Sequence, residues 1–331
     1  MSKITAAITA VGAYVPDYVL TNQILETMVD TNDEWITSRT GIKERRILKG
    51  EGKGTSFLAI KAAQDLINKR GIDPKDIELV IVATATPDMK AASTSAFTAT
   101  EIGAINAFSF DLEAACSSFL FGMSTAAKYI ESGRYKNVLL IGADKNSSFI
   151  NYEDRATCII FGDGAGAVLF EPNNENLGLQ DEYLKSDGSG REFLQATHGG
   201  SLYPMTKDTF KNGDQYVFQE GRTVFKNAVS NMADVALKIL ERNNLTKEDI
   251  TWLAAHQANK RIVDATANRI ELKKDKVMIN IEKYGNTTSA TLPLLLHDYE
   301  SQLKKGDNII FTTFGGGFTW GSIYLKWAYN S

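Results

Sequence analysis

The sequence predicts an α/β fold built from two similar halves. Helical stripes of apolar residues alternate with short apolar runs that are typical of buried strands. Units of this kind recur at a nearly constant spacing along the chain. The chain has 331 residues, 43% of them hydrophobic, and a single hydrophobic core seldom exceeds about 250 to 300 residues. The same composition excludes intrinsic disorder.

The repeat is clearest where a helix leads through a turn into a buried strand. An apolar stripe and the strand after it are expected over residues 59–67 and 79–82, and again over 225–240 and 252–255. The best-matched positions, at offsets of 173 and 171, are Asp76 with Asp249 and Asn137 with Asn308. We therefore expect two halves, residues 1–174 and 175–331. Chance similarity of α/β segments is the alternative.

Charge and cysteine content narrow the class of protein. The net charge of −4 provides no global basic field for a nucleic acid. Two cysteines are too few for a disulfide framework or a Cys-rich metal site, so we expect a reduced, cytoplasmic protein. No apolar run approaches the roughly 18 residues that span a bilayer. The N-terminal residues are expected to form a first strand rather than a secretion signal.

Cys116 is the candidate nucleophile. It stands where strand-like alternation ends and a helical stripe begins, at Phe119. The free N–H groups and the positive end of the dipole at a helix N-terminus stabilise a thiolate. An inert buried cysteine is the alternative, because that is the commonest fate of this residue type.

Two further polar residues are expected near Cys116. Of the three histidines, His297 lies among leucines and His198 in a segment expected to be a surface loop, whereas His256 is expected to follow a buried strand and precede a helix. Ligands bind at such strand ends in α/β sheets. By the repeat offset, the helix expected to begin at Asn286 is the equivalent of the helix after Cys116. Asn286 could donate a hydrogen bond to a ligand, or it could simply cap this helix.

Two glycine-rich segments, and possible metal-binding motifs, are the remaining features of the sequence that could form a ligand site. Three glycines at 315–317 follow a strand and allow backbone N–H groups to approach a ligand, although a structural bulge is the alternative. The segment 161–170 is expected to be a tight turn, because strand-like residues follow it where a nucleotide-binding loop needs a helix. No metal-ligand spacing occurs, so no metal is expected.

Six segments together carry a family pattern. They are Asn32-Asp-Glu-Trp-Ile-Thr-Ser-Arg-Thr-Gly-Ile-Lys-Glu-Arg-Arg46, Glu113-Ala-Ala-Cys-Ser-Ser-Phe, Ile160-Phe-Gly-Asp-Gly-Ala-Gly-Ala, His256-Gln-Ala-Asn-Lys-Arg-Ile, Tyr284-Gly-Asn-Thr-Thr-Ser-Ala and Phe314-Gly-Gly-Gly-Phe-Thr-Trp-Gly. In this order they resemble the β-ketoacyl-acyl carrier protein synthase III family, condensing enzymes of the thiolase superfamily. The resemblance covers nearly the whole chain.

The resemblance implies a thiolase-like, five-layered αβαβα fold and a homodimer. It implies a catalytic triad of Cys116, His256 and Asn286, with the oxyanion held by the N–H groups of Cys116 and Gly316. It also implies that no cofactor is tightly bound and that coenzyme A enters as the thioester substrate. The residues implied to bind coenzyme A are Trp35, Arg39 and Arg155, whose types suit stacking and anion binding.

The implied reaction joins an acyl-CoA primer to malonyl-acyl carrier protein, with loss of CO₂, and starts fatty acid synthesis. The acidic carrier protein needs positive charge, for which Lys260, Arg261 and Arg269 are the candidates, Arg261 first; a solvated helix face is the alternative. The remaining alternatives are a thiolase-fold acyltransferase of secondary metabolism and a non-catalytic acyl-thioester binder.

Two departures from the family pattern bear on specificity. Ala91 and Ala92 stand where the family often has a bulky residue that lines the acyl pocket from the neighbouring subunit, so a primer larger than acetyl is expected. Ser118 replaces a frequent glycine, with no effect that the sequence alone reveals.

Overall fold

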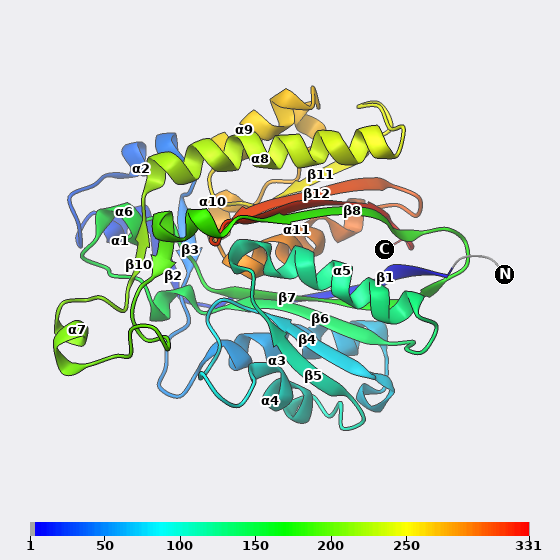
Figure 1. Cartoon of the computed structure of the whole chain (residues 1–331), viewed down its shortest axis with the longest axis horizontal. Coiled ribbons are helices and arrows are strands. Elements are labelled where there is room, and N and C mark those ends of the chain that lie inside the picture. Colours follow the sequence, from blue (N-terminus) through cyan, green and yellow to red (C-terminus); the bar gives the residue numbers. More distant parts are fainter. Residues whose placement is uncertain (1–3, 331) are drawn as a thin grey trace.

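The computed structural model describes residues 4–330, in which two large β-sheets have helices on both sides of each and two further sheets have two strands apiece (Figure 1). The strands are β1 Thr5–Tyr14, β2 Val19–Thr21, β3 Glu44–Arg46, β4 Leu79–Ala83, β5 Phe108–Leu112, β6 Val138–Asp144, β7 Gly164–Asn173, β8 Gly178–Ser186, β9 Leu194–Ala196, β10 Val217–Gln219, β11 Trp252–Ala255, β12 Asn308–Gly315 and β13 Thr319–Lys326. The α-helices are α1 Asn22–Leu25, α2 Asp33–Thr40, α3 Thr55–Arg70, α4 Thr94–Glu101, α5 Ser118–Glu131, α6 Arg155–Cys158, α7 Lys207–Lys211, α8 Gly221–Arg242, α9 Lys260–Arg269, α10 Ile281–Tyr284 and α11 Thr291–Tyr299.

The two large sheets have the same strand plan. The first has the order β1-β7-β6-β4-β5 and the second β8-β13-β12-β11. The turns that contain the matched residues Asp76 and Asp249 lead into β4 and β11. Each of these strands pairs in parallel with a neighbour, β4 with β6 and β11 with β12. The next two pairings are antiparallel in both sheets. This shared plan supports a duplicated unit, while the boundary between residues 174 and 175 stays a prediction.

Five layers follow from how the helices cover the sheets. Helices α3 and α4 lie outside the first sheet, α5 and α11 lie between the sheets, and α8 and α9 cover the outer face of the second (Figure 1). Helix α5 can occupy a middle layer because apolar side chains surround it, including Phe119, Leu120 and Met123, each fully buried. The αβαβα expectation is confirmed.

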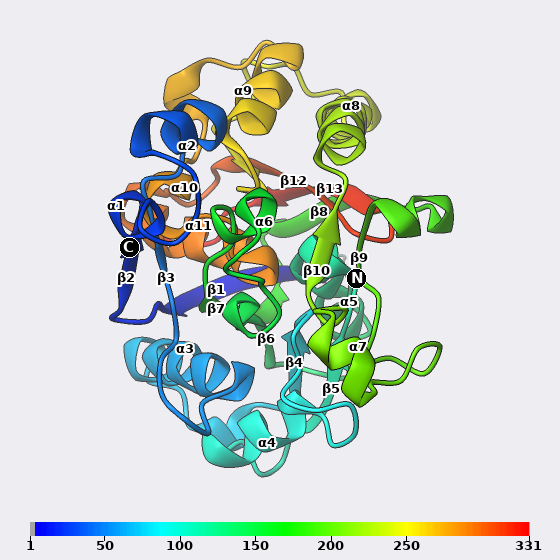
Figure 2. The same cartoon turned by 90° about the vertical axis from the view of Figure 1, so that its left-hand side faces the viewer.

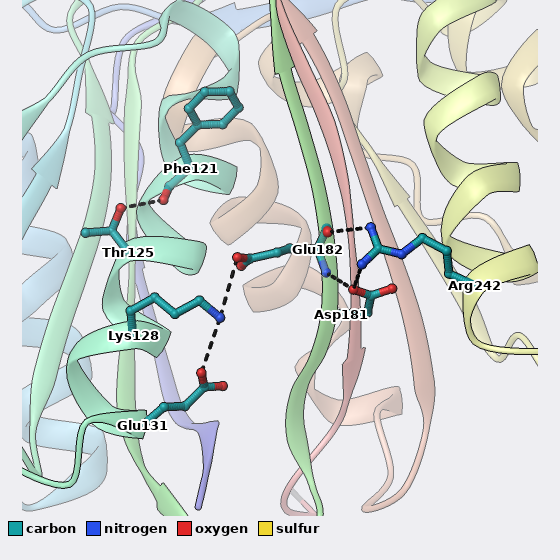
Figure 3. Close-up of polar contacts among 7 residues, drawn as sticks. All are labelled: Phe121, Thr125, Lys128, Glu131, Asp181, Glu182 and Arg242. Carbon is teal, nitrogen blue, oxygen red and sulfur yellow. Dashed lines mark hydrogen bonds and ion pairs between the residues drawn. The ribbon is translucent and has the colours of Figure 1, made fainter.

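The two halves are joined mainly by apolar packing. One cluster of buried residues includes Val11 and Phe119 from the first half and Phe311 from the second. Ion pairs add to this contact: Figure 3 shows Lys128 of α5 between Glu131 and Glu182 of β8, at 3.2 and 3.5 Å. Exposed pairs of this kind contribute about 1 kcal/mol or less, so burial dominates.

Each middle-layer helix is entered through a strained turn. Short 3₁₀ turns at Ala115–Ser117 and Thr288–Ala290 precede α5 and α11, and their first residues have positive φ angles of 48° and 53°. These turns match at an offset of 173, which pairs Cys116 with Ser289. The expected match with residues 286–287 was therefore two to three residues too early, because an offset of 171 holds for β6 and β12 but not for these turns.

The shorter elements gather at one end of the layers. There α2, α6 and α10 lie near one another, and α2 also approaches α9 (Figure 2). The apolar residues under them, among them Ile36, Ile42 and Ile159, form a separate cluster. Residues of α2, α6 and α9 line a large cavity that opens at this end.

Candidate active site

A cavity of about 930 Å³ reaches from this end of the molecule to the middle layer. The sequence-predicted residues that line it are Trp35, Arg39, Cys116, His256, Arg261, Asn286 and Gly316. The members of the expected triad therefore share one chamber, although two come from the second half of the chain. Its walls carry many apolar residues, including Phe161, Val224 and Phe314, as expected for a chamber that excludes water.

Cys116 lies in the 3₁₀ turn between β5 and α5, and Ser118 fixes the shape of that turn. The Ser118 hydroxyl accepts a hydrogen bond from the Ala114 N–H and donates one to the Ala115 carbonyl, both at 2.7 Å. Both bonds lie beside Ala115, whose left-handed φ disfavours a side chain. Ser118, which replaces a glycine that is frequent in the family, thus holds the turn that contains Cys116 in place.

The end of β12 packs directly against the same turn. A Cβ atom added at Gly315 would lie 2.7 Å from the Cys116 backbone nitrogen, so no larger residue fits without movement. The next residue, Gly316, lies against Leu194 and Ala115. Glycine at 315 is therefore required by close approach.

The Cys116 side chain does not have the lowered pKa that its helix position led us to expect. Burial raises the pKa of its thiol to about 12, and the negative charge of Asp144 acts in the same direction. A hydrogen bond from the Asn286 side chain opposes this. The resting form at neutral pH is the thiol, because desolvation outweighs the hydrogen bonds at this position.

His256 is neutral and has both ring nitrogens available. His256 directly follows β11, and its backbone N–H donates to the Thr312 carbonyl of β12. Neither of its ring nitrogens has a hydrogen-bond partner among residues 4–330. Burial lowers the pKa of the imidazole to about 3. A fully buried neutral imidazole with open nitrogens can donate one hydrogen bond and accept another.

Asn286 is held so that its amide can serve the cavity. Its Oδ1 accepts from the Thr288 N–H at 2.9 Å, and its backbone bonds to Ile160 and Gly162. The Asn286 oxygen therefore supports the turn before α11, and its side chain also forms a hydrogen bond with Cys116, while its role as a donor in the reaction stays a prediction.

Known proteins identify the family of this site. Models described as 3-oxoacyl-[acyl-carrier-protein (ACP)] synthase III match residues 110–188 and, for the C-terminal part, residues 240–327. The β-ketoacyl-[acyl-carrier-protein] synthase III 2 of Bacteroides thetaiotaomicron is 57% identical over 330 residues, which cover 100% of this chain and 98% of that protein. The chain belongs to the 3-oxoacyl-[acyl-carrier-protein] synthase III family. It is thus a condensing enzyme of the acyltransferase type.

Solved structures agree with this assignment. The crystal structure of the Aquifex aeolicus 3-oxoacyl-[acyl-carrier-protein] synthase III superposes with a TM-score of 0.90 at 39% identity, covering 97% of this chain and 100% of that one. The priming β-ketosynthase of the R1128 polyketide pathway also has a TM-score of 0.90, at 29% identity, with 98% and 97% covered.

At the opening of the cavity, two residues expected to bind coenzyme A face each other. The Arg155 guanidinium lies 5.0 Å from the centre of the Trp35 ring. Arg39 follows one turn later on α2 and lines the cavity. At this distance the guanidinium and the ring are in cation–π contact with each other, so a flat base would fit between them only after they moved apart.

The three basic residues expected to meet a carrier protein differ in their surroundings. Lys260 pairs with Asp264 at 2.7 Å and Arg269 pairs with Asp234. Arg261 lies 5.0 Å from the Phe225 ring, lines the cavity and has no ion pair within the described part of the chain. The geometry therefore favours Arg261.

Three further sets of residues lie at or near the cavity in ways that the sequence predicted only in part. Ala91 and Ala92 are exposed and do not line the cavity of their own chain, whereas the nearby Lys90 does. Cys158 is buried and ends α6. His198 lies in a loop, as expected, but it is half-buried and lines the cavity.

Gln257 supports the site, and although it lies in the family segment that begins at His256, the sequence did not predict a role for it. It is fully buried, donates to the carbonyls of Ala255 and Met278, and accepts from the N–H groups of Asn280 and Ile281. These bonds tie the His256 turn to the segment before Asn286.

Between residues 4 and 330 there is no cluster of three or more His, Cys, Asp or Glu side chains suited to a metal ion. No helix in that range is long and apolar enough to cross a membrane.

Proposed function

We propose that this chain condenses an acyl-CoA primer with malonyl-acyl carrier protein, releasing CO₂ and forming a 3-oxoacyl-acyl carrier protein, as the first step of fatty acid synthesis. One observation carries the proposal: Cys116, His256 and Asn286 line one cavity, with a stacking pair of Trp35 and Arg155 near its opening. The name of the Bacteroides relative is consistent with this reaction.

In the first half-reaction the Cys116 sulfur attacks the thioester carbonyl of acyl-CoA. The neutral His256 accepts the thiol proton as the carbon–sulfur bond forms, and this proton leaves with the coenzyme A thiolate. The N–H groups of Cys116 and Gly316 stabilise the tetrahedral oxyanion. The products are acyl-Cys116 and free coenzyme A.

In the second half-reaction malonyl-acyl carrier protein takes the vacated place. His256 and Asn286 donate hydrogen bonds to its thioester oxygen, so that loss of CO₂ leaves an enolate rather than a bare carbanion. The enolate carbon attacks the acyl carbonyl and expels the Cys116 thiolate, which then takes a proton. No base is needed, because decarboxylation supplies the electron pair, and a neutral imidazole suits this role.

Intact-mass measurement tests the proposal. Incubation with acyl-CoA should add one acyl group to the wild type and none to Cys116→Ala, and malonyl-acyl carrier protein should then discharge the adduct with CO₂ release. An adduct that is discharged without CO₂ would indicate acyl transfer to another acceptor. Absence of an adduct from every acyl-CoA would indicate a non-catalytic binder.

A role in secondary metabolism is the second candidate. It is favoured by the close fold match with the priming β-ketosynthase of the R1128 pathway. A chain-length series of acyl-CoA primers separates the two, and it also tests the expected primer larger than acetyl at Ala91 and Ala92. Acylation by acetyl-CoA alone would contradict that expectation.

The partners proposed are coenzyme A thioesters at Trp35, Arg39 and Arg155, and an acidic carrier protein at Arg261. A homodimer is supported by β5, an edge strand of the first sheet whose Phe108 side chain is 42% exposed. A second copy pairing there would cover it. A cytoplasmic location stays a prediction.

A further inference from the structure

Arg45 is buried without a charged partner. Its side chain is fully buried in β3, and it donates to the carbonyl of Leu20 at 3.2 Å and to Oδ1 of Asn22 at 2.8 Å. Its other terminal nitrogen donates to the carbonyl of Ile159 at 2.5 Å. No carboxylate pairs with it in residues 4–330. Burying a cation among neutral acceptors costs more than burying an aliphatic chain of similar size, so the position needs an explanation.

On one side, Arg45 acts through Asn22 on the helix that carries Trp35. Asn22 is also fully buried. Its side-chain nitrogen donates to Oδ1 of Asp33, the first residue of α2, at 2.7 Å, and to the carbonyl of Ile42, just beyond the end of α2, at 2.8 Å. Asn22 therefore holds both ends of α2, and Arg45 fixes the orientation of the Asn22 amide.

On the other side, Arg45 acts on the helix that carries Arg155. Ile159 directly follows α6, which is only four residues long and begins with Arg155. The carbonyl of Ile159 is one of the groups left open at the end of that helix, and the Arg45 guanidinium satisfies it. One buried cation thus contacts the supports of both members of the stacking pair.

We propose that Arg45 and Asn22 are positioning residues that set the spacing between Trp35 and Arg155, and thereby the affinity for the adenosine part of coenzyme A. This rests on the proposed function for the identity of the ligand. Arg45 does not line the cavity and does not reach the reacting atoms. It therefore acts on the stacking pair of Trp35 and Arg155 and not on the chemistry at Cys116.

The test compares ligands with and without adenosine in Arg45→Met and Asn22→Ala. Methionine keeps the apolar stem of Arg45, which packs against Gly162 and Gly285, and removes only the guanidinium. Asn22→Ala leaves the cation in place and provides a milder variant should Arg45→Met fold poorly. Thr5→Val, which loses a buried hydroxyl bonded to the Leu177 carbonyl outside the cavity, is the control for general destabilisation.

In calorimetric titrations with coenzyme A, Arg45→Met and Asn22→Ala should each have a dissociation constant about tenfold larger than that of the wild type. This loss of affinity is expected when the cation–π stack is misaligned. Acylation of Cys116 by an acyl-pantetheine thioester, which lacks adenosine, should keep its kcat/KM within about twofold. Thr5→Val should change neither quantity.

Unchanged affinity for coenzyme A would overturn the inference, and so would an equal loss for both ligands, which would indicate a purely structural role. The binding measurement needs no turnover. A wild type that binds coenzyme A but forms no acyl adduct at Cys116 would therefore refute the proposed function. The binding comparison would still test the role of Arg45 and Asn22.

Discussion

The neutral, buried imidazole of His256 should make the protein lose stability as the pH falls. Its pKa is about 3 in the folded chain because burial disfavours the imidazolium, against about 6.5 for a histidine in an unfolded chain. Between these values the unfolded chain binds a proton that the folded chain does not. The contribution is therefore fully present above pH 6.5 and is lost progressively toward pH 3.

The size of this effect follows from the pKa difference. Each pH unit below 6.5 costs about 1.4 kcal/mol, so near pH 5 the free energy of unfolding falls by about 2 kcal/mol on account of His256. His256→Gln removes the titrating group and replaces the imidazole with an uncharged amide side chain of similar length. Other titrating groups are common to both proteins and cancel in the comparison.

Urea unfolding followed by circular dichroism at pH 7.5 and pH 5 gives the two free energies for each protein. The wild type should lose about 2 kcal/mol more than His256→Gln over this range. His297→Gln, at a histidine 38% exposed, controls for replacing a histidine in general. Equal losses in the wild type and His256→Gln would refute the claim that His256 is buried in its neutral form.

Three further substitutions test the site. Asn286→Ala should slow condensation by about 10²-fold, because one enolate donor is lost, and should slow acylation by acyl-CoA much less; equal losses in stopped-flow assays would contradict its role. Gly315→Ala should reduce acylation about 10- to 100-fold, because its Cβ would lie 2.7 Å from the Cys116 nitrogen, whereas Gly188→Ala, whose Cβ meets open space, should be silent in the same mass assay. Arg261→Ala should raise the KM for malonyl-acyl carrier protein about tenfold and Lys260→Ala less, because Asp264 already pairs with Lys260; the reverse order would assign the dock elsewhere.

That Cys116, His256 and Asn286 line one cavity could be predicted because the sequence signals at these positions are local. Cys116 lies in the turn that leads into α5, Asn286 lies two residues before the turn that leads into α11, and His256 follows a strand, so a change of periodicity marks the neighbourhood of all three positions. The duplicated strand plan was predictable for the same reason. The fold then brings the three together through the repeat, which places the two helix starts opposite each other.

What the sequence could not provide depends on contacts between distant segments. The partner of Arg269 is Asp234 on α8, so an apparently free basic residue is paired. Arg45 stands in a run of charged residues typical of a surface, yet it is fully buried. The Cys116 pKa was expected in the wrong direction, because the burial that raises it results from packing of the second half against the turn.

The central claim is that one cavity brings a malonyl thioester to the hydrogen-bond donors His256 and Asn286 beside acylated Cys116. A crystal structure of the acyl-enzyme with a malonyl thioester mimic that cannot lose CO₂ tests it most directly. The account predicts an acyl group on the Cys116 sulfur and the mimic's carbonyl oxygen within hydrogen-bond distance of both His256 and Asn286. An acyl group on another residue, or a mimic whose carbonyl oxygen contacts neither side chain, would contradict it.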